Sequence, residues 1–432
     1  MPKLITSRTR IEDLNKPRII IIGGGFGGME LIKKLKGSNA QVVLFDKHNH
    51  HTFQPLLYQV ATSALQTNSI VYPFRKKFND YQDFYFRLAE VTRVVPDENR
   101  IETSIGSVKY DYLVLATGST SNYFGQQSFE DNTLPLKTIE DAIVLRNRLI
   151  THFELALLEE DSRNMNSYID YVIVGGGPTG VEVAGALAEL KRHVFPRDYK
   201  ELDMKEMDIH LVEAAPRLLN VMSERASEKA LEYLQQLGVK VHLNCQLKSY
   251  DGFTAKFDAI DEIISRSVIW AAGVKGKGIQ GLNEDKYTPA GRLMVNEYNL
   301  VESYENIFAI GDVACQVSDK YPRGYPMMAP AAIAQGKLLA ANLKRMIKGK
   351  SPKAFKYQHK GNMATIGRNL AVTEIGAFRI YGFFGWLIWI FVHLMALVSF
   401  KNRIAVFFTW MIGYLSFDKS NRFIIGNNYG PK

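Results

Sequence analysis

Short continuous apolar runs followed by glycine-rich turns are the dominant pattern in the N-terminal and central parts of the chain. Arg18–Ile22 (RIIII) and Tyr171–Val174 (YVIV) are the clearest of these runs. Continuous apolar runs of this length are typical of strands buried on both faces of a parallel sheet. Each run leads into a glycine turn and then into a helical pattern, MELIKKLK after the first and VEVAGALAEL after the second. The pattern predicts an α/β protein in which one strand-turn-helix unit occurs twice.

The C-terminal region has a different pattern, with two long apolar blocks. Residues 382–400 form a block of nineteen in which only His393 and Ser399 are polar, and a second block covers residues 404–417. A 19-residue helix is about 28 Å long, close to the thickness of a bilayer core. The first block therefore satisfies the length requirement for a spanning helix, whereas the second is short for a partner span.

Aromatic and basic residues in these blocks favour a position at the membrane surface. Trp386, Trp389 and Trp410 are residues typical of the membrane interface, and Lys401 and Arg403 can contact anionic headgroups. We therefore expect a helical region that lies in one leaflet, with a spanning helix and a buried core helix as the alternatives.

The first glycine turn has the spacing of a dinucleotide-binding fingerprint. Gly23, Gly25 and Gly28 follow the first apolar run, and Asp46 ends the next run, QVVLF, 23 residues after Gly23. In such a turn the first glycine makes the bend, the second lets the backbone approach a pyrophosphate and the third allows close packing of helix on strand. The helix N-terminus faces the phosphates, and the acid accepts from a ribose hydroxyl.

The second turn repeats this arrangement with Gly175, Gly177 and Gly180. The run DIHLV ends at Glu213, 38 residues after Gly175, and the surplus over the usual spacing of about 20 predicts an insertion after the helix, at residues 191–206. A carboxylate at this position accepts from a ribose 2′-hydroxyl and repels a 2′-phosphate, so Glu213 favours NADH over NADPH. Arg217 lies close enough in sequence to weaken that preference.

Three further strands end in glycine turns and extend the two units. They cover residues 111–119 (DYLVLATGS), 267–274 (SVIWAAGV) and 305–314 (ENIFAIGDVA). The turns place Ala116, Thr117, Gly118, Gly273, Gly311 and Asp312 at strand ends. Asp312 is suited to hold the ribityl chain or a ribose of a flavin. Two dinucleotide sites in one chain indicate electron transfer between two nucleotides, although a duplicated site retained for structure alone is the alternative.

Composition and charge narrow the classes of function. The 432 residues carry a net charge of +9, which suits an anionic lipid surface or nucleic acid, but the charge is spread along the chain and nucleic-acid binding is not expected. Cys245 and Cys315 are far apart, so neither a disulfide framework nor a dithiol centre is predicted. His48, His50 and His51 lack a matching distant partner set, and no metal site is predicted. The polar N-terminus carries no signal peptide, which predicts a cytoplasmic protein.

With these motifs the chain resembles the flavoprotein superfamily with two dinucleotide sites, in which an NAD(P)H domain is inserted into an FAD domain. Residues 45–66 (FDKHNHHTFQPLLYQVATSALQ) and 360–372 (KGNMATIGRNLAV), together with the apolar blocks, resemble type II NADH dehydrogenase. That family consists of single-chain, membrane-associated NADH:quinone oxidoreductases that pump no protons. The resemblance extends from about Arg18 to Ile425.

The resemblance implies FAD and NADH as cofactors and assigns residues to each. FAD is expected at the Gly23 turn and at Gly25, Phe26, Asp46, Lys47 and Asp312, with backbone contacts near Val91 and Ala332. NADH is expected at Gly177, Gly180, Glu182, Glu213 and Gly273.

Two side chains are candidates for the chemistry at the quinone. Glu182, two residues after Gly180, is expected to relay a proton to the quinone, with charge complementarity at the helix N-terminus as the alternative. Lys360 is the candidate for stabilising the reduced flavin or assisting that relay, with a solvated lysine as the alternative.

The segment MAPAAIAQG departs from the family pattern. The family's quinone-site helix carries AQxxxQ, but here Pro330 and Ala334 occupy the two glutamine positions, and only Gln335 remains nearby. Neither residue can bond a quinone carbonyl through its side chain. An NADH oxidase or diaphorase that uses oxygen is therefore one alternative, and a flavin-based redox sensor that docks a membrane partner is another.

The predicted organisation has three parts. Residues 1–137 and 291–360 form the FAD domain, 138–290 the NADH domain and 361–432 the helical membrane-anchoring region. The expected partners are a quinone and an anionic lipid surface at the cytoplasmic face of the membrane, and we also consider a homodimer.

Overall fold

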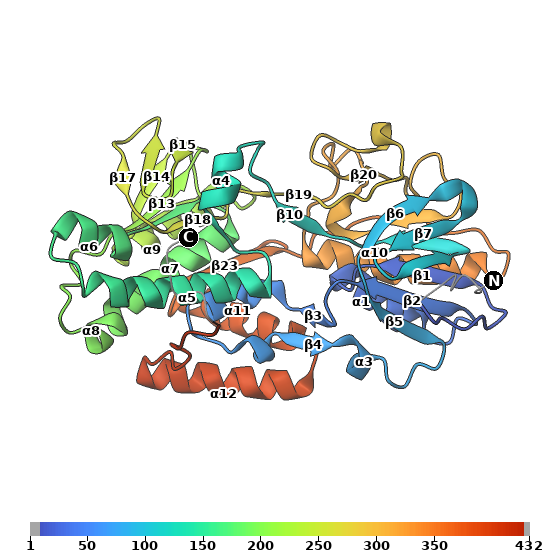
Figure 1. Cartoon of the computed structure of the whole chain (residues 1–432), viewed down its shortest axis with the longest axis horizontal. Helices are drawn as coiled ribbons and strands as arrows, with labels where there is room; N and C mark the ends of the chain where they lie inside the picture. The colour runs from blue at the N-terminus through green and yellow to red at the C-terminus, as the bar shows by residue number, and fades with distance from the viewer. Residues whose placement is uncertain (1–8, 427–432) are drawn as a thin grey trace, which may run out of the picture. The chain divides into compact units, whose positions relative to one another are not determined.

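The computed structural model describes residues 9–426, and the chain divides into two compact units (Figure 1). Unit 1 comprises the N-terminal residues up to 51 together with residues 72–120 and 274–359. Unit 2 comprises residues 52–71, 121–273 and those from 360 onward. Residues 1–8, the start of the polar N-terminus on which the absence of a signal peptide was predicted, lie outside the described part.

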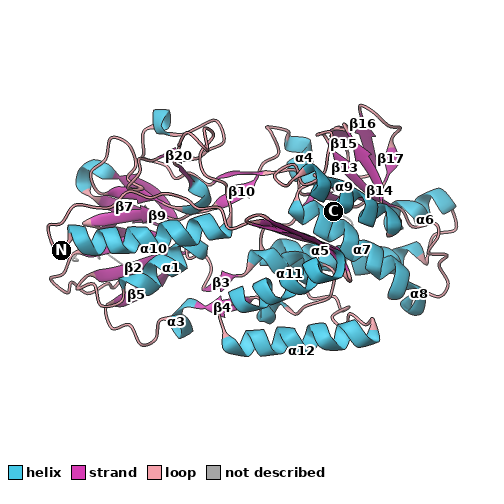
Figure 2. Ribbon diagram, turned by 180° about the vertical axis from the view of Figure 1, so that it is seen from behind, coloured by secondary structure: helices cyan, strands magenta, loops and turns pink. Residues whose placement is uncertain are grey.

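Unit 1 is built on a five-stranded parallel sheet with the order β21-β9-β1-β2-β5. These strands are β1 (Arg18–Ile22), β2 (Gln41–Asp46), β5 (Phe84–Leu88), β9 (Tyr112–Leu115) and β21 (Ile307–Ala309). The first two are almost entirely buried, as their continuous apolar runs predict. Helices α1 (Phe26–Leu35) and α10 (Ala329–Met346) pack closely together in this unit (Figure 2). Their close approach depends on Gly336, where a Cβ atom would lie 2.4 Å from the Gly27 carbonyl oxygen.

Smaller elements complete unit 1. An antiparallel sheet contains β6 (Val91–Val95), β7 (Arg100–Thr103) and β8 (Gly106–Lys109), and a short pair joins β20 (Leu293–Met294) to β22 (Ala314–Cys315). Helix α3 covers Phe74–Lys77. The buried Arg292 guanidinium bonds the carbonyl oxygens of Ala314 at 2.5 Å and Tyr325 at 2.8 Å, which fixes the segment after β21.

Unit 2 contains a second five-stranded parallel sheet with the order β11-β18-β12-β13-β14. These strands are β11 (Leu134–Pro135), β12 (Tyr171–Val174), β13 (Ile209–Glu213), β14 (Lys240–Leu243) and β18 (Val268–Trp270). Its helices are α4 (Gln127–Asn132), α5 (Ile139–Ala156), α6 (Ser162–Ile169), α7 (Pro178–His193), α8 (Phe195–Asp198) and α9 (Glu224–Gln236), and α2 (Leu57–Ala61) packs on this group. An antiparallel sheet of β15 (Leu247–Tyr250), β16 (Thr254–Phe257) and β17 (Ile263–Ile264) follows β14.

The insertion predicted at residues 191–206 begins later than expected. Helix α7 continues to His193, and α8 follows at Phe195–Asp198. Lys191, Arg192 and His193 complete the last turn of α7, where cations interact favourably with the helix dipole.

The C-terminal region is less purely helical than predicted. It begins with an antiparallel sheet of β23 (Asn362–Gly367), β24 (Leu370–Ile375) and β25 (Phe378–Tyr381). Two helices follow, α11 (Gly382–Ala396) and α12 (Phe400–Ser416), and both views show them side by side (Figures 1 and 2). The nineteen-residue apolar block is therefore interrupted, because α11 ends at Ala396 and the Ser399 side chain caps a new helix by accepting from Asn402 N. No helix between residues 9 and 426 combines the length and apolarity needed to cross a membrane.

Candidate functional site

The first glycine turn has the tight geometry that its spacing predicts. Gly23 has φ of +103°, and a Cβ atom there would lie 2.3 Å from the Ala116 carbonyl oxygen. A Cβ on Gly28 would lie 2.1 Å from the Gly23 carbonyl oxygen. Only glycine allows both contacts, so β1, β9 and α1 are held at close range. The Asp46 carboxylate accepts from Gly24 N at 2.7 Å and anchors the turn to β2.

The residues around this turn fit a flavin dinucleotide. Gly25 caps α1, and a Cβ there would meet no atom within 4 Å among the described residues, so the backbone is open to a pyrophosphate. The turn at Gly311 and Asp312 is the other segment predicted to contact the flavin. Its Gly311 N donates to the Gln335 side-chain oxygen at 2.7 Å, and Ser119 donates to Asp312 at 2.5 Å. Gln335 is therefore engaged in holding the Gly311 turn.

The other predicted flavin residues also belong to unit 1. Two of them, Thr117 and Gly118, are hydrogen-bonded to the backbone of Lys277. Thr117 donates to the Lys277 carbonyl oxygen at 2.5 Å, and Lys277 N donates to Gly118 O at 3.0 Å. Burial and then the charge of Lys47 lower the pKa of Lys277, which places these two lysines near each other.

Three more flavin residues complete the set. Phe26 packs edge-on against His51, with 5.0 Å between ring centroids, and the buried His51 ring bonds the Gly24 carbonyl oxygen at 3.0 Å. Ala332 lies next to Gly311, whose added Cβ would be 3.3 Å from the Ala332 methyl. Val91 opens β6 and pairs with Thr103.

The second turn, in unit 2, repeats the geometry of the first. Gly175 has φ of +113°, and its added Cβ would lie 2.5 Å from Ala271 O, while one on Gly180 would lie 1.9 Å from Gly175 O. Gly177 caps α7 and faces open space. Glu213 accepts from Gly176 N at 2.5 Å, so this acid is hydrogen-bonded to the turn despite the long spacing, and its contact with a ribose stays a prediction.

Two further residues bear on the nicotinamide nucleotide. Gly273 has φ of +143°, and its carbonyl oxygen accepts from Asn122 N at 3.1 Å. The Arg217 guanidinium bonds Met222 O, Asn220 O and Ser227 Oγ at 2.8–3.0 Å. Because Arg217 is committed to its own loop, it offers less to a 2′-phosphate than its place in the sequence suggests.

Glu182 lies in the first half of α7 and is buried, with 9% of its surface exposed. Burial raises its pKa to about 8, against the smaller opposing effects of the Thr365 backbone and the Trp389 side chain. The close contact of α7 with β23 produces this burial, since a Cβ on Gly185 would lie 1.5 Å from the Ile366 carbonyl oxygen. Glu182 is therefore a neutral acid at pH 7, held in an apolar environment.

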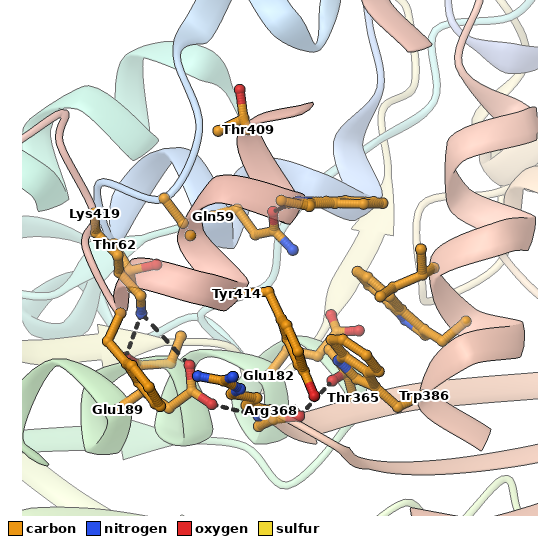
Figure 3. A pocket seen from close by; sticks show the side chains of 18 of the residues that line it. Gln59, Thr62, Glu182, Glu189, Thr365, Arg368, Trp386, Thr409, Tyr414 and Lys419 are labelled. Carbon is orange, nitrogen blue, oxygen red and sulfur yellow. Dashed lines mark hydrogen bonds and ion pairs between the residues drawn. The ribbon is translucent and has the colours of Figure 1, made fainter. Parts of the chain in front are cut away.

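Glu182 opens onto a cavity of about 450 Å³ that lies wholly within unit 2 (Figure 3). Helices α2, α7, α11 and α12, strand β23 and the segment after α12 form its walls. Most of the lining is apolar or aromatic, and it includes Tyr58, Phe383, Trp386, Leu387, Trp389, Ile390, Phe407, Trp410, Tyr414 and Phe417. The polar side chains of the lining include Gln59, Thr62, Glu182 and Thr365. An apolar cavity with a few convergent polar groups is the usual form of a small-molecule site.

The charged residues of the cavity lining include Glu189, Arg368 and Lys419. Lys419 Nζ lies 3.9 Å from the Glu189 carboxylate and 3.2 Å from the Ala186 carbonyl oxygen, and burial lowers the pKa of Lys419. The Arg368 guanidinium lies between two rings, 3.8 Å from the Tyr414 centroid and 3.9 Å from the Phe417 centroid. These contacts tie the segment after α12 to α7 and β23.

Lys360 is not among the residues that line this cavity. It is exposed in the segment just before β23, in unit 2. Its proposed role beside the flavin therefore stays a prediction.

The two C-terminal helices expose large apolar side chains. Phe391 of α11 is 64% exposed, and Ile412 and Leu415 of α12 are 60% and 74% exposed. The other exposed apolar side chains of these helices include Phe383, Phe384, Leu387, Met395, Phe400, Ile404, Phe407, Phe408 and Met411. Many exposed apolar side chains on two neighbouring helices are typical of a surface that contacts a membrane or a partner.

Sequence reasoning missed most of the cavity. Tyr58 and Gln59 fall within a segment that carries the family resemblance, yet no role was assigned to them. Their partner Trp410 was interpreted only as an interfacial anchor. Its indole Nε1 donates to the Gln59 side-chain oxygen at 2.7 Å across 351 positions of sequence, a pairing that no local pattern indicates.

The fold and the two turns define an oxidoreductase with two dinucleotide sites, and the comparisons with known proteins agree. The pyridine nucleotide-disulphide oxidoreductase family matches residues 17–336, and the NDH2 C-terminal domain matches residues 359–416. Two type II NADH:quinone oxidoreductases of Mycobacterium tuberculosis are 33% and 34% identical to this chain, in each case over 92% of it and over 88% and 87% of their own length. The solved structure of NDH2 from Plasmodium falciparum in complex with NADH superposes with a TM-score of 0.86 at 20% identity, covering 95% of this chain and all of that one.

The chain therefore belongs to the type II NADH:quinone oxidoreductase family. This confirms the predicted family and the predicted α/β fold with two Rossmann-like parts. The predicted cofactors, FAD and NADH, are those of this family.

Proposed function

We propose that this protein transfers two electrons from NADH to a membrane quinone, without pumping protons, and that FAD links the two substrates. The observation that carries the proposal is the cavity in unit 2, where the neutral Glu182 carboxyl meets apolar and aromatic walls. A quinone has an apolar body and two carbonyl oxygens that need donors and protons. The cavity supplies both kinds of surface.

The glycine turns support the assignment of the two nucleotides. When bound, FAD supplies the two-electron chemistry between NADH and quinone. The residues assigned to it are Gly23, Gly25, Phe26, Gly28, Asp46, Lys47, Val91, Ala116, Thr117, Gly118, Gly311, Asp312 and Ala332. Gly175, Gly177, Gly180, Glu213 and Gly273 bind NADH in this proposal, and the engagement of Arg217 by its own loop supports NADH over NADPH.

Glu182 is the proton donor in this proposal. Reduction of a quinone to a quinol consumes two electrons and two protons. The hydride of NADH accounts for the two electrons and one proton, and the carboxyl of Glu182 donates the second proton to a quinone oxygen and is then reprotonated from solvent. Its pKa of about 8 supports the role, because the acid keeps its proton at neutral pH and can still release it.

The membrane assignment rests on the C-terminal helices. As a member of this family the protein is a peripheral membrane enzyme, and we propose that the exposed apolar faces of α11 and α12 lie in the cytoplasmic leaflet, with Lys401 and Arg403 at anionic headgroups. Release by carbonate extraction is the expected result for such a protein. The division into an FAD domain (1–137 and 291–360), an NADH domain (138–290) and an anchoring region (361–432) remains part of the proposal, as does a homodimer.

A second candidate, an NADH oxidase that uses oxygen, is favoured by one observation. Pro330 occupies the first turn of α10, where proline is well tolerated, and Ala334 lies one turn later. The side chains of proline and alanine carry no hydrogen-bond donor, so neither residue can bond a quinone carbonyl. The remaining Gln335 is engaged with Gly311 N.

Steady-state NADH oxidation with and without a short-chain quinone tests the proposal. We expect strong stimulation by quinone in the FAD-loaded enzyme. Turnover with oxygen alone would instead support the oxidase, and bound flavin without turnover would support a redox sensor.

A further inference from the structure

Three side chains of the cavity form one hydrogen-bonded chain. Tyr58 and Gln59 lie on α2, and Trp410 lies on α12. The Trp410 indole Nε1 donates to Gln59 Oε1 at 2.7 Å, and Gln59 Nε2 donates to the Tyr58 hydroxyl at 2.9 Å. All three residues line the cavity onto which Glu182 opens, and Figure 3 shows Gln59 at its wall.

The chemistry of the groups fixes the direction of this chain. An indole N–H can only donate, so the Gln59 amide must present its oxygen to Trp410. Its NH₂ group then faces Tyr58 and can also only donate. The Tyr58 hydroxyl oxygen must therefore accept from Gln59, and its own proton cannot point toward Gln59. The ambiguity of amide orientation that usually attends a glutamine is removed here by the indole.

The Tyr58 hydroxyl is thus a donor that this chain leaves open. The side chain is buried, with 6% of its surface exposed. Within the described residues 9–426, its hydroxyl accepts from Gln59 Nε2 and donates to no protein group. Burial and then the nearby Glu182 raise the pKa of Tyr58, so the hydroxyl keeps its proton. A buried donor with no acceptor costs free energy unless a ligand or water completes it.

We propose that the Tyr58 hydroxyl donates a hydrogen bond to a carbonyl oxygen of the quinone bound in this cavity, with Gln59 and Trp410 as positioning residues. This inference rests on the proposed function. A quinone head group has only acceptors, and the protonated Glu182 carboxyl is a second donor in the same cavity. Tyr58 therefore supplies a donor of the kind that Pro330 and Ala334 cannot.

The chain also polarises its last member. Each donor whose partner is itself donating becomes a stronger donor, so Trp410 acts on the quinone through Gln59 and Tyr58. Without the indole, the Gln59 amide can rotate so that its oxygen accepts the Tyr58 proton. The Tyr58 hydroxyl would then donate to Gln59 and no longer to the quinone. In this proposal Trp410, which lies on α12, orients the Tyr58 donor through Gln59.

The first test is Tyr58→Phe in the FAD-loaded full-length enzyme. The loss of one neutral hydrogen bond predicts a KM for a short-chain quinone raised about 3- to 10-fold. Reduction of ferricyanide, an acceptor with no carbonyl oxygen, should be unchanged, and so should the rate at which NADH bleaches the flavin anaerobically. An unchanged quinone KM, or an equal loss with ferricyanide, would overturn the inference.

The second test uses Trp410→Phe and a matched control. Trp386→Phe removes another indole from the same cavity, one that lies tilted against Tyr414 with 5.3 Å between ring centroids and takes no part in the hydrogen-bonded chain. We expect Trp410→Phe to raise the quinone KM and Trp386→Phe to change it less. The double variant Tyr58→Phe/Trp410→Phe should be no worse than Tyr58→Phe alone, because Trp410 acts through Tyr58. Additive losses would overturn the positioning role.

Failure of this inference is distinct from failure of the proposed function. If the wild-type enzyme reduces no quinone, the proposed function is wrong. If it reduces quinone and Tyr58→Phe leaves the quinone KM unchanged, the function stands and the role of Tyr58 is wrong.

Discussion

The two glycine turns each carry a glutamate two residues after the third glycine, and the two glutamates differ in every other respect. Glu30 follows Gly28 in α1 and pairs with Lys33 at 3.6 Å and Lys34 at 3.9 Å. Glu182 follows Gly180 in α7, where it is buried and its pKa is raised to about 8. The same motif thus produces an ion-paired carboxylate in unit 1 and a neutral acid in unit 2.

The difference comes from what packs on each helix. In α1 the glutamate has its own helix's lysines three and four residues later, the spacing at which opposite charges attract. In α7 the residue three positions later is Gly185, which brings β23 against the helix, and Glu182 is buried there with 9% of its surface exposed. A dinucleotide fingerprint therefore specifies the turn. The protonation and the possible role of the glutamate that follows the third glycine depend on the segments that pack on the helix, here β23.

The largest expected effects come from the third glycine of each turn. Gly28→Ala and Gly180→Ala both force a Cβ to within about 2 Å of a carbonyl oxygen, so the helix must move away from its strand. Gly28→Ala should yield protein with little bound flavin. Gly180→Ala should stay yellow and lose at least about 100-fold in kcat/KM for NADH, which corresponds to about 2.7 kcal/mol.

Flavin content by absorbance and anaerobic bleaching by NADH measure the two outcomes, and each variant is the control for the other. Loss of flavin from Gly180→Ala would contradict the assignment of the two turns to different nucleotides.

The glutamates themselves give the second contrast. Glu182→Gln removes the proton donor that we propose, and it should slow quinone-dependent turnover by about 100-fold. Flavin reduction by NADH should stay within about twofold of the wild-type rate. Glu30→Gln is the matched control, with the same substitution at the same position of the other turn, and we expect little change in either step.

The pH dependence of turnover sharpens this contrast. As a donor, Glu182 must be protonated, so wild-type quinone reduction should fall as pH rises through about 8. Stopped-flow measurement of both half-reactions between pH 6 and about 9 checks this. A fall that persists in Glu182→Gln would assign the titration to another group.

Substitution of Glu213, at the end of β13, should change the preference for NADH over NADPH, whereas substitution of Asp46, at the end of β2, should not. Glu213→Ala should lower the preference for NADH over NADPH by about tenfold, because repulsion of the 2′-phosphate is lost. Arg217 stays bound to its own loop, so NADPH gains little new attraction. Asp46→Ala in the first turn should leave the coenzyme ratio unchanged while reducing flavin content. Competitive kinetics with the two coenzymes measure the ratio.

The sequence predicted both turns down to their acids because a turn is a local structure. Strand, glycine spacing and helix lie within about thirty residues, and Glu213 could be placed even with a long insertion because it ends an apolar run. Ser399 was also visible as one of two polar residues in its block, and a capping serine there could have predicted the break between α11 and α12.

The cavity could not be predicted because its parts come from distant segments. Glu182 owes its burial to Ile366 of β23, and Gln59 of α2 owes its orientation to Trp410 of α12. The sheet β23–β25 was missed because its strands mix polar with apolar residues and do not form continuous apolar runs. Pairings of this kind depend on tertiary contacts, which leave no periodicity in the sequence.

The smallest expected effect is on stability, and it again separates the two glutamates. The folded-state pKa of Glu182 is raised to about 8, above the value of about 4.5 expected when unfolded. The folded state therefore binds more protons, and the Glu182 contribution to stability is fully present below about pH 4.5 and declines as pH rises toward about 8. Glu182→Gln carries no such cost, so its thermal midpoint relative to wild type should be higher at pH 8 than at pH 5, by a few degrees. Glu30→Gln should show no comparable gain, because the ion-paired Glu30 is not shut away from water. Scanning calorimetry of the three proteins at both pH values decides the matter, and equal shifts for the two variants would mean that burial by β23 does not set the proton affinity of Glu182.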